Sequence, residues 1–409
     1  MKSILNRIKK NYNEFMQCAR KNDVKVGKIK YLKFVYYCTK YSISINDYFF
    51  NRLYDTSVSH KDFWSKNHKI IHRWKNVIKN HMPDVSLGWR MRHYIDYIFS
   101  RLLYPGLDAM DYIRYEFYNF KRSKRKTFIT ENSLRRMNKF FNDERKNMFE
   151  FRILQDKAKF NEHFSNVVSR KWIKTEGMSK EEFNKFCEGL DRVIAKPKDG
   201  SQGKGIFIVS ITNEEEKDNL FEKLKTQDYL LEELIVQCDE IAKLNPRAVN
   251  SIRINSVLVN NEVVITSATL RLGSGKSDTD NYSAGGFAAS IDVKTGIVIS
   301  RAVSQHGLYT YSHPLTQEII IGTQIPNWDK VLDTVKSSHR KISSLRYVGW
   351  DVVVCADGAV TFLEANTFAG VALQQHPLLE GKKPLYKRLK KELLLERKRQ
   401  KTYESKLKK

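Results

Sequence analysis

The chain has little cysteine and no long apolar run. Its five cysteines form no Cys-x-x-Cys pair and their number is odd, which indicates reduced, mostly buried thiols in a reducing compartment. No stretch of eighteen apolar residues occurs, so we expect no membrane-spanning helix. The first residues lack the apolar core of a secretion signal. Together these absences predict a cytoplasmic protein.

Acidic residues are scarce relative to basic ones: 46 Asp and Glu stand against 72 Lys and Arg, a formal net charge of +26. A field of this sign attracts polyanions such as nucleic acid, anionic lipid or acidic polysaccharide. An AT-rich genome would produce the same excess, because it raises Lys, Asn, Ile, Tyr and Phe together. Charge alone therefore selects no partner, although we do not expect nucleic acid to be one.

The length of 409 residues predicts two or three domains. Residues 1–145 are predicted to form a mostly helical region, since apolar residues recur at spacings of three and four in 93–104 and 111–120. Residues 146–380 contain both strand-like and helix-like patterns, which predicts an α+β domain. Residues 381–409 are predicted to form a basic C-terminal helix.

Two segments concentrate positive charge. Residues 121–126 hold five basic side chains in six positions, and 382–409 hold 13 Lys and Arg with 3 Glu, a net of 13 − 3 = +10. Either segment could contact an anionic surface, such as the inner face of a membrane or a polysaccharide. Alternatively, each segment is only a solvated loop or a frayed helix end. The sequence does not decide between surface binding and this alternative.

The α+β region reads as strands and helices in alternation. Apolar runs bounded by glycine, asparagine and aspartate predict two hairpins, one turned at Asn260–Asn261 and one at 356–358. The predicted strands are 192–197, 205–210, 229–236, 251–260 and 262–272, and the predicted helices are 213–225 and 327–342.

The second hairpin, residues 351–366, carries oxygen ligands at both of its ends. Asp351 begins the first strand, while Glu364 and Asn366 end the second and share one face because side chains alternate along a strand. Folding the hairpin back brings the three residues together. Two carboxylates and an amide oxygen suit Mg²⁺, which prefers oxygen ligands. The sequence therefore predicts a metal site here.

A lysine followed by a glycine-rich loop predicts phosphate contacts. Lys196 lies near the end of a predicted strand, and glycines let backbone N–H groups after it approach phosphate oxygens closely. The loop comprises Gly200, Ser201, Gln202, Gly203, Lys204 and Gly205. A second Gly-Lys-Ser sequence ends at Ser277, but Leu270 stands where a P-loop requires glycine, which excludes a P-loop NTPase.

Two further groups of side chains lie between the loop and the hairpin. Glu232 and Glu233 follow a predicted strand whose exposed backbone could pair with an adenine edge, and a later carboxylate could take ribose hydroxyls. Arg253 and Arg271 lie on the predicted central strands, where guanidinium groups suit a transferring phosphoryl group or an oxyanion. Singly, each arginine would more often be a salt-bridge partner.

In order, the chain offers Asp156–Lys157, Lys196–Pro197, the glycine loop, Glu232–Glu233, Arg271, Asp351 and Glu364-Ala-Asn366. This series resembles the ATP-grasp superfamily, which includes D-alanine–D-alanine ligase. More narrowly, Asn245-Pro with Asn250-Ser-Ile-Arg253, Arg271-Leu-Gly with Gly285-Gly286, and Gly349-Trp350-Asp351 resemble the sugar-transfer-associated ATP-grasp proteins. Those proteins are related to alpha-L-glutamate ligases and occur with surface-polysaccharide biosynthesis. The resemblance spans residues 145–380 and implies two α+β subdomains that grip ATP.

The resemblance also implies roles for individual residues. Lys157, or Lys159 in its place, would contact ATP phosphates together with Lys196, and the glycine loop would close over them. Asp239 would take the ribose, with Gln237 or Glu240 as substitutes, and Arg271 would meet the γ-phosphate, with Arg253 as a companion. The adenine pocket would be lined by Glu232, Glu233, Leu234 and Ile235. Two Mg²⁺ ions would be held by Asp351, Glu364 and Asn366.

The implied reaction is ATP-dependent ligation of a carboxylate to an amine through an acyl phosphate. For a polysaccharide-associated member, the carboxylate would belong to a sugar or uronic acid. Two other classes of function stay open from the sequence: phosphoryl transfer without ligation by a sugar or small-molecule kinase on the same fold, and a non-catalytic basic protein that binds a polyanion or a membrane surface.

Overall fold

The computed structural model describes residues 69–104, 106–142, 148–198, 205–275, 280, 282 and 285–407. Two compact units make up the chain, Met1–Arg136 and Met137–Lys409, and each is described by itself. Among the helices in the described ranges, none has both the length and the hydropathy that crossing a bilayer requires.

The described part of the first unit consists of helices around an aromatic core. Trp74 stacks on Tyr97 at 5.1 Å between ring centroids, and Tyr112 meets both rings edge-on. Serine and aspartate cap two of the helices, since Ser86 accepts from the Trp89 backbone and Asp108 from that of Met110. The helices are α5 (Lys69–His81), α6 (Leu87–Leu103), α7 (Ala109–Arg114), the short 3₁₀ helix η1 (Phe117–Asn119), α8 (Arg122–Arg125) and α9 (Glu131–Phe141), the last crossing into the second unit.

The helix predicted over 93–104 is confirmed as part of α6, but the helix predicted over 111–120 is wrong beyond Arg114. The backbone of Glu116 adopts φ 47°, a left-handed conformation that ends a right-handed helix. This break turns Tyr115 and Phe117 into the aromatic core, where both are buried. Burial of the two rings therefore overrides the helical periodicity.

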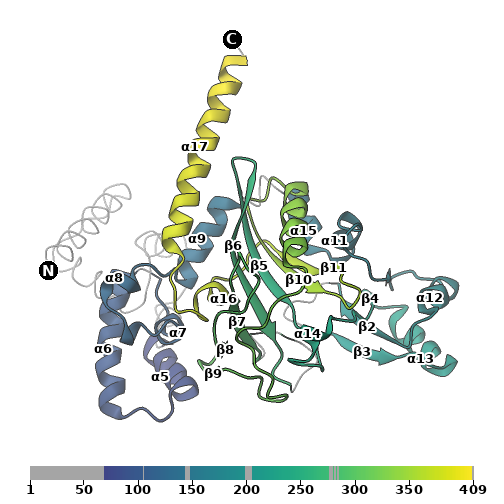
Figure 1. The fold of residues 1–409 in the computed structure, drawn as a ribbon, viewed down its shortest axis with the longest axis horizontal. Helices are drawn as coiled ribbons and strands as arrows, with labels where there is room; N and C mark the ends of the chain where they lie inside the picture. The colour runs from purple at the N-terminus through teal and green to yellow at the C-terminus, as the bar shows by residue number, and fades with distance from the viewer. Residues whose placement is uncertain are drawn as a thin grey trace, which may run out of the picture. The chain divides into compact units, whose positions relative to one another are not determined.

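The second unit is an α+β structure with two antiparallel sheets, as predicted (Figure 1). The smaller sheet has the order β1-β4-β2-β3 and the larger one the order β11-β10-β5-β6-β7-β8-β9. The strands are β1 (Trp172–Lys174), β2 (Arg192–Pro197), β3 (Phe207–Ser210), β4 (Tyr229–Glu233), β5 (Ile252–Val259), β6 (Glu262–Leu272), β7 (Phe287–Ile291), β8 (Ala302–Ser304), β9 (Tyr309–Thr310), β10 (Tyr347–Val354) and β11 (Val360–Asn366). The helices are α10 (Met148–Gln155), α11 (Lys157–His163), α12 (Lys180–Cys187), α13 (Glu214–Leu224), α14 (Asp239–Ala242), α15 (Trp328–Lys341), α16 (Ala372–Gln375) and α17 (Lys383–Leu407).

Both hairpins predicted from turn residues are present. β5 and β6 pair from Val259↔Glu262 inward, and the two turn residues Asn260 and Asn261 have φ 51° and 62°. Two successive left-handed residues are what a tight hairpin turn requires, and asparagine tolerates them best after glycine. Strand β2 spans the predicted residues, and helices α13 and α15 lie within the predicted ranges.

The two faces of the larger sheet have different neighbours. On one face, His339 of α15 is hydrogen-bonded to Ser256 at 2.7 Å, and Trp350 donates to the same hydroxyl at 2.9 Å. On the other face, Tyr386 of α17 is hydrogen-bonded to Thr266 of β6 at 3.0 Å. Figure 1 shows α17 continuing past the end of the sheet. Because side chains alternate along a strand, residues two apart in β5 and β10 share a face.

Candidate functional site

The hairpin β10–β11 brings together the three oxygen ligands predicted from the sequence. Asp351 is the cross-strand partner of Glu364, and Gly349 is the partner of Asn366, so all three ligands lie on one face of the sheet. The connection between the strands contains Gly358 at φ 76°, a left-handed turn position that glycine adopts without strain. The proximity predicted from the sequence is confirmed.

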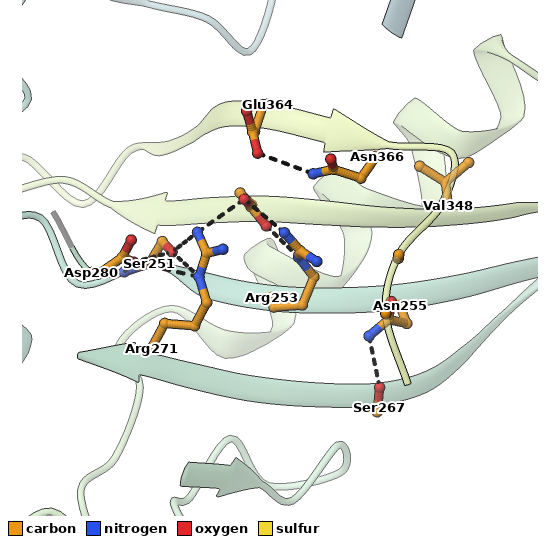
Figure 2. Close-up of polar contacts among 12 residues, drawn as sticks. Ser251, Arg253, Asn255, Ser267, Arg271, Asp280, Val348, Glu364 and Asn366 are labelled. Carbon is orange, nitrogen blue, oxygen red and sulfur yellow. Dashed lines mark hydrogen bonds and ion pairs between the residues drawn. The ribbon is translucent and has the colours of Figure 1, made fainter. Parts of the chain in front are cut away.

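Asp351 is the most enclosed member of the group, with 1% of its surface exposed. Arg253 grips it with two nitrogens, Nε on Oδ1 and Nη2 on Oδ2, the second at 3.0 Å. Arg271 donates from Nη2 to Oδ2 at 2.9 Å. Figure 2 labels Arg253 and Arg271 on the neighbouring strands β5 and β6, and the dashed lines that represent these bonds run from both side chains to one carboxylate, which is not labelled. Burial alone would raise the pKa of Asp351, but Arg253 and Arg271 outweigh it and hold this pKa at about 2.

Arg271 has a support that the sequence did not indicate. Its Nε and Nη2 donate to Ser251 Oγ at 2.8 and 2.5 Å, and Nε lies 3.5 Å from Asp280 Oδ2. Asp280 in turn accepts from the Ser251 backbone N–H at 2.8 Å. The only hint was general: a buried guanidinium on a central strand needs carboxylate partners. Asp280 and Ser251 therefore fix the position of Arg271.

Glu364 and Asn366 form the open part of the group. Asn366 Nδ2 donates to Glu364 Oε1 at 3.1 Å, as Figure 2 shows. Glu364 is solvent-accessible, but the protein around it displaces much of its hydration, and this desolvation together with the negative charge of Asp351 raises the pKa of Glu364. The two residues offer oxygen atoms that a hard cation can reach.

The donor set fits Mg²⁺ in kind, since it consists of two carboxylates and an amide oxygen. Within the described ranges, no three His, Cys, Asp or Glu side chains gather into a group able to hold a metal. Asn366 belongs to none of these four residue types, so its amide oxygen does not count toward such a group. A cation at Asp351 would share that carboxylate with two guanidinium groups, whereas Glu364 and Asn366 bind no cationic side chain in the described contacts.

A second ionic cluster lies at the smaller sheet. Glu232, with 1% of its surface exposed, accepts from Arg170 Nε at 2.8 Å and pairs with Lys196 Nζ. Asn161 Nδ2 adds a bond to Glu232 Oε1 at 2.9 Å. The attraction of Lys196 and Arg170 exceeds the cost of burial and lowers the pKa of Glu232 far below its usual range. Sequence reasoning found Lys196 and Glu232 but missed Arg170 and Asn161.

Arg170 joins the two clusters, because its Nη1 donates to the carbonyl of Phe362 at 2.7 Å. Phe362 lies two residues before Glu364 on β11, so the guanidinium connects the Lys196 cluster to the ligand hairpin. The Glu232 side chain is engaged in ion pairs, so an adenine base next to β4 would have to bind backbone groups. The backbone of Ile235 has no hydrogen-bond partner among the described residues.

The segment after β4 runs along the ligand hairpin. The Cys238 backbone donates to Val354 O at 3.0 Å, and the Ala356 backbone donates to Val236 O at 2.9 Å. Asp239 is exposed at the start of α14, whereas Gln237 is buried and occupied by the backbone of Asn250. Of the alternative ribose ligands, Asp239 and Glu240 are therefore the accessible ones. Glu233 and Leu234, predicted to line the adenine pocket, are half-buried.

The predicted phosphate ligand Lys157 contacts the residues that lead into the glycine loop. Its Nζ donates to the carbonyls of Pro197 at 2.7 Å and Lys198 at 3.1 Å, which fixes it against the start of the loop. The alternative, Lys159, is exposed. Gly200, Ser201, Gln202, Gly203 and Lys204 lie outside the described residues. Gly205 has φ 74°, and a Cβ there would stand 2.9 Å from the Pro197 ring, so the loop ends in a position that only glycine fits.

Comparison with known proteins identifies the family. The family model of the sugar-transfer associated ATP-grasp proteins matches residues 123–391, well over half of the chain. No curated protein matches the chain.

Solved structures resemble parts of the chain at low identity. D-alanine–D-alanine ligase from Bacillus anthracis is 16% identical over 62% of this chain and 71% of its own, with a TM-score of 0.37. The ATP-grasp ligase PsnB, solved with a phosphomimetic variant of a minimal precursor, Mg and ADP, is 13% identical over 77% and 72%, also at 0.37. N5-carboxyaminoimidazole synthetase from Staphylococcus aureus, complexed with ADP, is 12% identical over 56% and 52%, at 0.34.

The chain spans about half the length of the N5-carboxyaminoimidazole synthases that it matches, 52% in Staphylococcus aureus and 45% in Aspergillus clavatus. At TM-scores this low, the structural likenesses carry no argument about the site. The family match needs no support from them, since it covers both the Lys196 cluster and the ligand hairpin. The chain belongs to the sugar-transfer associated ATP-grasp family.

Proposed function

We propose that the protein is an ATP-dependent carboxylate–amine ligase. One observation carries the proposal: two guanidinium groups, Arg253 and Arg271, converge on one sheet face beside a carboxylate pair, Asp351 and Glu364. A reaction between a substrate carboxylate and the γ-phosphate of ATP brings two anions together, so it needs cationic groups placed in advance. A site of this composition can supply them.

Roles follow from position. Lys157 and Lys196, at the start of the glycine loop, would bind ATP phosphates, and the backbone near Ile235 would take the adenine edge. Asp351, Glu364 and Asn366 would hold Mg²⁺, with two ions as our expectation. Bound there, the metal would neutralise charge on the phosphates and on the substrate carboxylate.

The reaction would proceed in two displacements. A carboxylate oxygen of the first substrate attacks the γ-phosphorus of ATP, and the bond between the γ-phosphorus and the bridging β-phosphate oxygen breaks. ADP departs, and the first substrate becomes an acyl phosphate. The nitrogen of the amine then attacks the acyl carbon, inorganic phosphate departs and the nitrogen loses a proton, which yields the amide. Water would destroy the acyl phosphate, so closure of the glycine loop over the site suits this chemistry.

For the substrates we propose a sugar or uronic acid carboxylate and an amine, in the assembly of a surface polysaccharide such as a capsule. The family description, sugar-transfer associated, supports a carbohydrate substrate. The net charge of +26 supports an acidic one, because a positive field raises the local concentration of anions. This chemistry would take place in the cytoplasm, and contact of the basic helix α17 with the inner membrane face stays a proposal.

The test is a substrate screen read by product mass. ADP release is measured with uronic acids paired with amino acids and simple amines, and the products are identified by mass spectrometry. We expect ADP release that requires both substrates and an amide product. Glu364→Gln should abolish turnover. Asp357→Asn is the matched control, because Asp357 is an exposed acid in the turn of the same hairpin and caps its own turn at Ala359.

The products separate the rival functions. A phosphorylated acceptor without an amide would replace the ligase with a kinase on the same fold. If no pair stimulates ADP release, and Asp351→Ala and Glu364→Ala leave the cellular role intact, the protein is a non-catalytic binder of a polyanion or membrane.

A further inference from the structure

Gln237 is a buried amide that holds the backbone of a residue 13 positions further along the chain. Its Nε2 donates to the Asn250 carbonyl at 2.6 Å, and its Oε1 accepts from the Asn250 backbone N–H at 2.9 Å. One side-chain amide therefore satisfies both backbone polar groups of a single residue. This is the pairing that a residue in a neighbouring strand would otherwise supply.

The segment that carries Gln237 belongs to the nucleotide side of the site. It directly follows the backbone of Ile235, where the proposed function places the adenine edge. The Ala356 N–H of the ligand hairpin donates to Val236 O in this segment at 2.9 Å. The segment is therefore fixed to the hairpin through its backbone and to Asn250 through the Gln237 side chain.

Ser251, the residue after Asn250, holds Arg271. The Arg271 backbone N–H donates to the Ser251 carbonyl at 2.8 Å, and its Nε and Nη2 donate to Ser251 Oγ at 2.8 and 2.5 Å. The Ser251 N–H donates to Asp280 at 2.8 Å. Figure 2 shows Ser251 beside both Arg271 and Asp280. All polar groups of Ser251 are thus engaged, so a shift of the peptide between Asn250 and Ser251 would move Arg271.

No other group is in place to take over from Gln237. Asn250 and Ser251 are both 0% exposed, so their backbone is shielded from solvent. The Asn250 side chain is directed elsewhere, since its Nδ2 donates to the carbonyls of Ile241 and Asn245, both at 3.1 Å. Without the Gln237 amide, a buried N–H and a buried C=O would lose their partners, and the Asn250 backbone would have to move to recover them.

We propose that Gln237 is a positioning residue that places Arg271 for the γ-phosphate of the nucleotide. Gln237 holds the backbone of Asn250, and the next residue, Ser251, holds the guanidinium. The backbone that would take adenine and the cation that would meet the γ-phosphate are thereby fixed relative to each other before the nucleotide binds, which is the preorganisation that charge stabilisation requires. This inference rests on the proposed function, because it needs a nucleotide that reaches from the Ile235 backbone to Arg271.

The test compares two nucleotides that differ at the γ-phosphate. Calorimetry with Mg²⁺ measures the affinity of the full chain for ADP and for AMP-PNP, an ATP analogue with nitrogen between its β- and γ-phosphorus atoms. Gln237→Met keeps the length of the side chain but removes both bonds to Asn250. Its affinity for AMP-PNP should fall roughly tenfold, because Arg271 is no longer held for the γ-phosphate, while its affinity for ADP should stay within about twofold of wild type.

Gln374→Met is the matched control. Gln374 is also buried, and its amide also makes two bonds, donating to Tyr347 and accepting from Tyr386, both at 2.8 Å. This variant should lose stability but keep both nucleotide affinities. In the ligand-free protein, hydrogen exchange at the Ser251 amide should be faster in Gln237→Met and unchanged in Gln374→Met.

A second variant keeps the test decisive if Gln237→Met does not fold. Gln237→Glu has the same shape and still accepts from the Asn250 N–H, but its carboxylate cannot donate to the Asn250 carbonyl. We expect it to show the same selective loss of AMP-PNP affinity. Circular dichroism of each variant, compared with wild type, establishes which of them are folded.

The outcomes distinguish this inference from the proposed function. Equal losses of ADP and AMP-PNP affinity in Gln237→Met would overturn the inference, because Gln237 would then support the whole nucleotide pocket. Unchanged affinities for both nucleotides would overturn it as well. Wild-type protein that binds neither nucleotide would instead refute the proposed function, and the inference with it.

Discussion

Replacing Asp351 by asparagine should strongly destabilise the ligand-free protein. Asp351 is almost completely buried and accepts from both Arg253 and Arg271. Asparagine has the same shape but no charge, so the variant leaves two guanidinium groups without their shared counter-ion. Removing one partner of a buried ion pair costs about 3–5 kcal/mol, because the remaining charge stays desolvated.

The structure indicates where in this range the value falls. In the variant, Arg271 keeps its contacts with Ser251 and Asp280, so it loses only part of its stabilising interactions. Arg253 has no other hydrogen-bond partner among the described side chains, although the amide oxygen of asparagine can still accept one of its bonds. We therefore expect the free energy of unfolding to fall by about 3 kcal/mol, with most of the loss at Arg253.

Glu364→Gln is the contrasting variant. Partial desolvation and the charge of Asp351 raise the pKa of Glu364, so its ionised form is less favourable in the folded chain than in the unfolded one. The wild type therefore loses stability as pH rises from the unfolded pKa, about 4.3, through the raised folded value. Removing this acid should leave the stability at neutral pH unchanged or increased.

Urea unfolding in EDTA, followed by circular dichroism, measures both variants. The pH dependence adds a check, because the pKa of Asp351 is about 2 when folded. The stabilisation by ionised Asp351 is complete above about pH 3.9 and disappears as pH falls toward 2. With asparagine at this position, the free energy of unfolding should therefore fall less steeply between these two pH values. An Asp351→Asn protein as stable as wild type at neutral pH would refute the assignment of Asp351 as the buried counter-ion of Arg253.

Three further predictions concern other parts of the second unit. The pKa of His339 is lowered to about 4 by burial, so the folded chain should lose up to about 3 kcal/mol as pH falls from 6.5 toward 4, and urea titrations of His339→Gln should lack this loss. Gly296→Ala should lower the free energy of unfolding by about 3 kcal/mol, because φ is 75° and a Cβ would stand 2.5 Å from the Trp328 ring. Gly322→Ala, where φ is 85° but the space for a Cβ is open, should lower it by only about 1 kcal/mol. Thermal melts compare the two variants. Glu232→Gln should lower the free energy of unfolding by about 3–5 kcal/mol, since it leaves two buried cationic partners unpaired; urea unfolding at neutral pH measures it.

Local chemistry made the hairpins predictable from the sequence. Asn260–Asn261 and the Ala-Asp-Gly turn at 356–358 determine where each chain reverses, and strand alternation then places Asp351 opposite Glu364. The helix predicted over 111–120 failed for the opposite reason. Its apolar spacing was helical, but burial of Tyr115 and Phe117 in an aromatic core required a left-handed break between them.

The ion pairs could not be predicted in the same way, because they join distant parts of the chain. Arg253 meets Asp351 across 98 positions of sequence, and Arg170 meets Glu232 across 62. Each pair depends on how strands far apart in sequence come together, which no local pattern records. For this reason the sequence indicated Arg253 as a catalytic group and Asp351 as a metal ligand, and did not show that they neutralise each other.

This neutralisation divides the site into two parts. Arg253 and Arg271 compensate the buried carboxylates of Asp351 and Asp280, and breaking any one of these pairs is costly. Glu364 is the remaining acid of the group, and it is also the accessible one. A cation that enters from solvent can therefore reach Glu364 without first separating a buried ion pair, whereas at Asp351 it would share the carboxylate with two guanidinium groups. Under the proposed function, Glu364 would be the ligand that a cation reaches first, while Arg253 and Arg271, held in place by Asp351, would attract the anionic substrate.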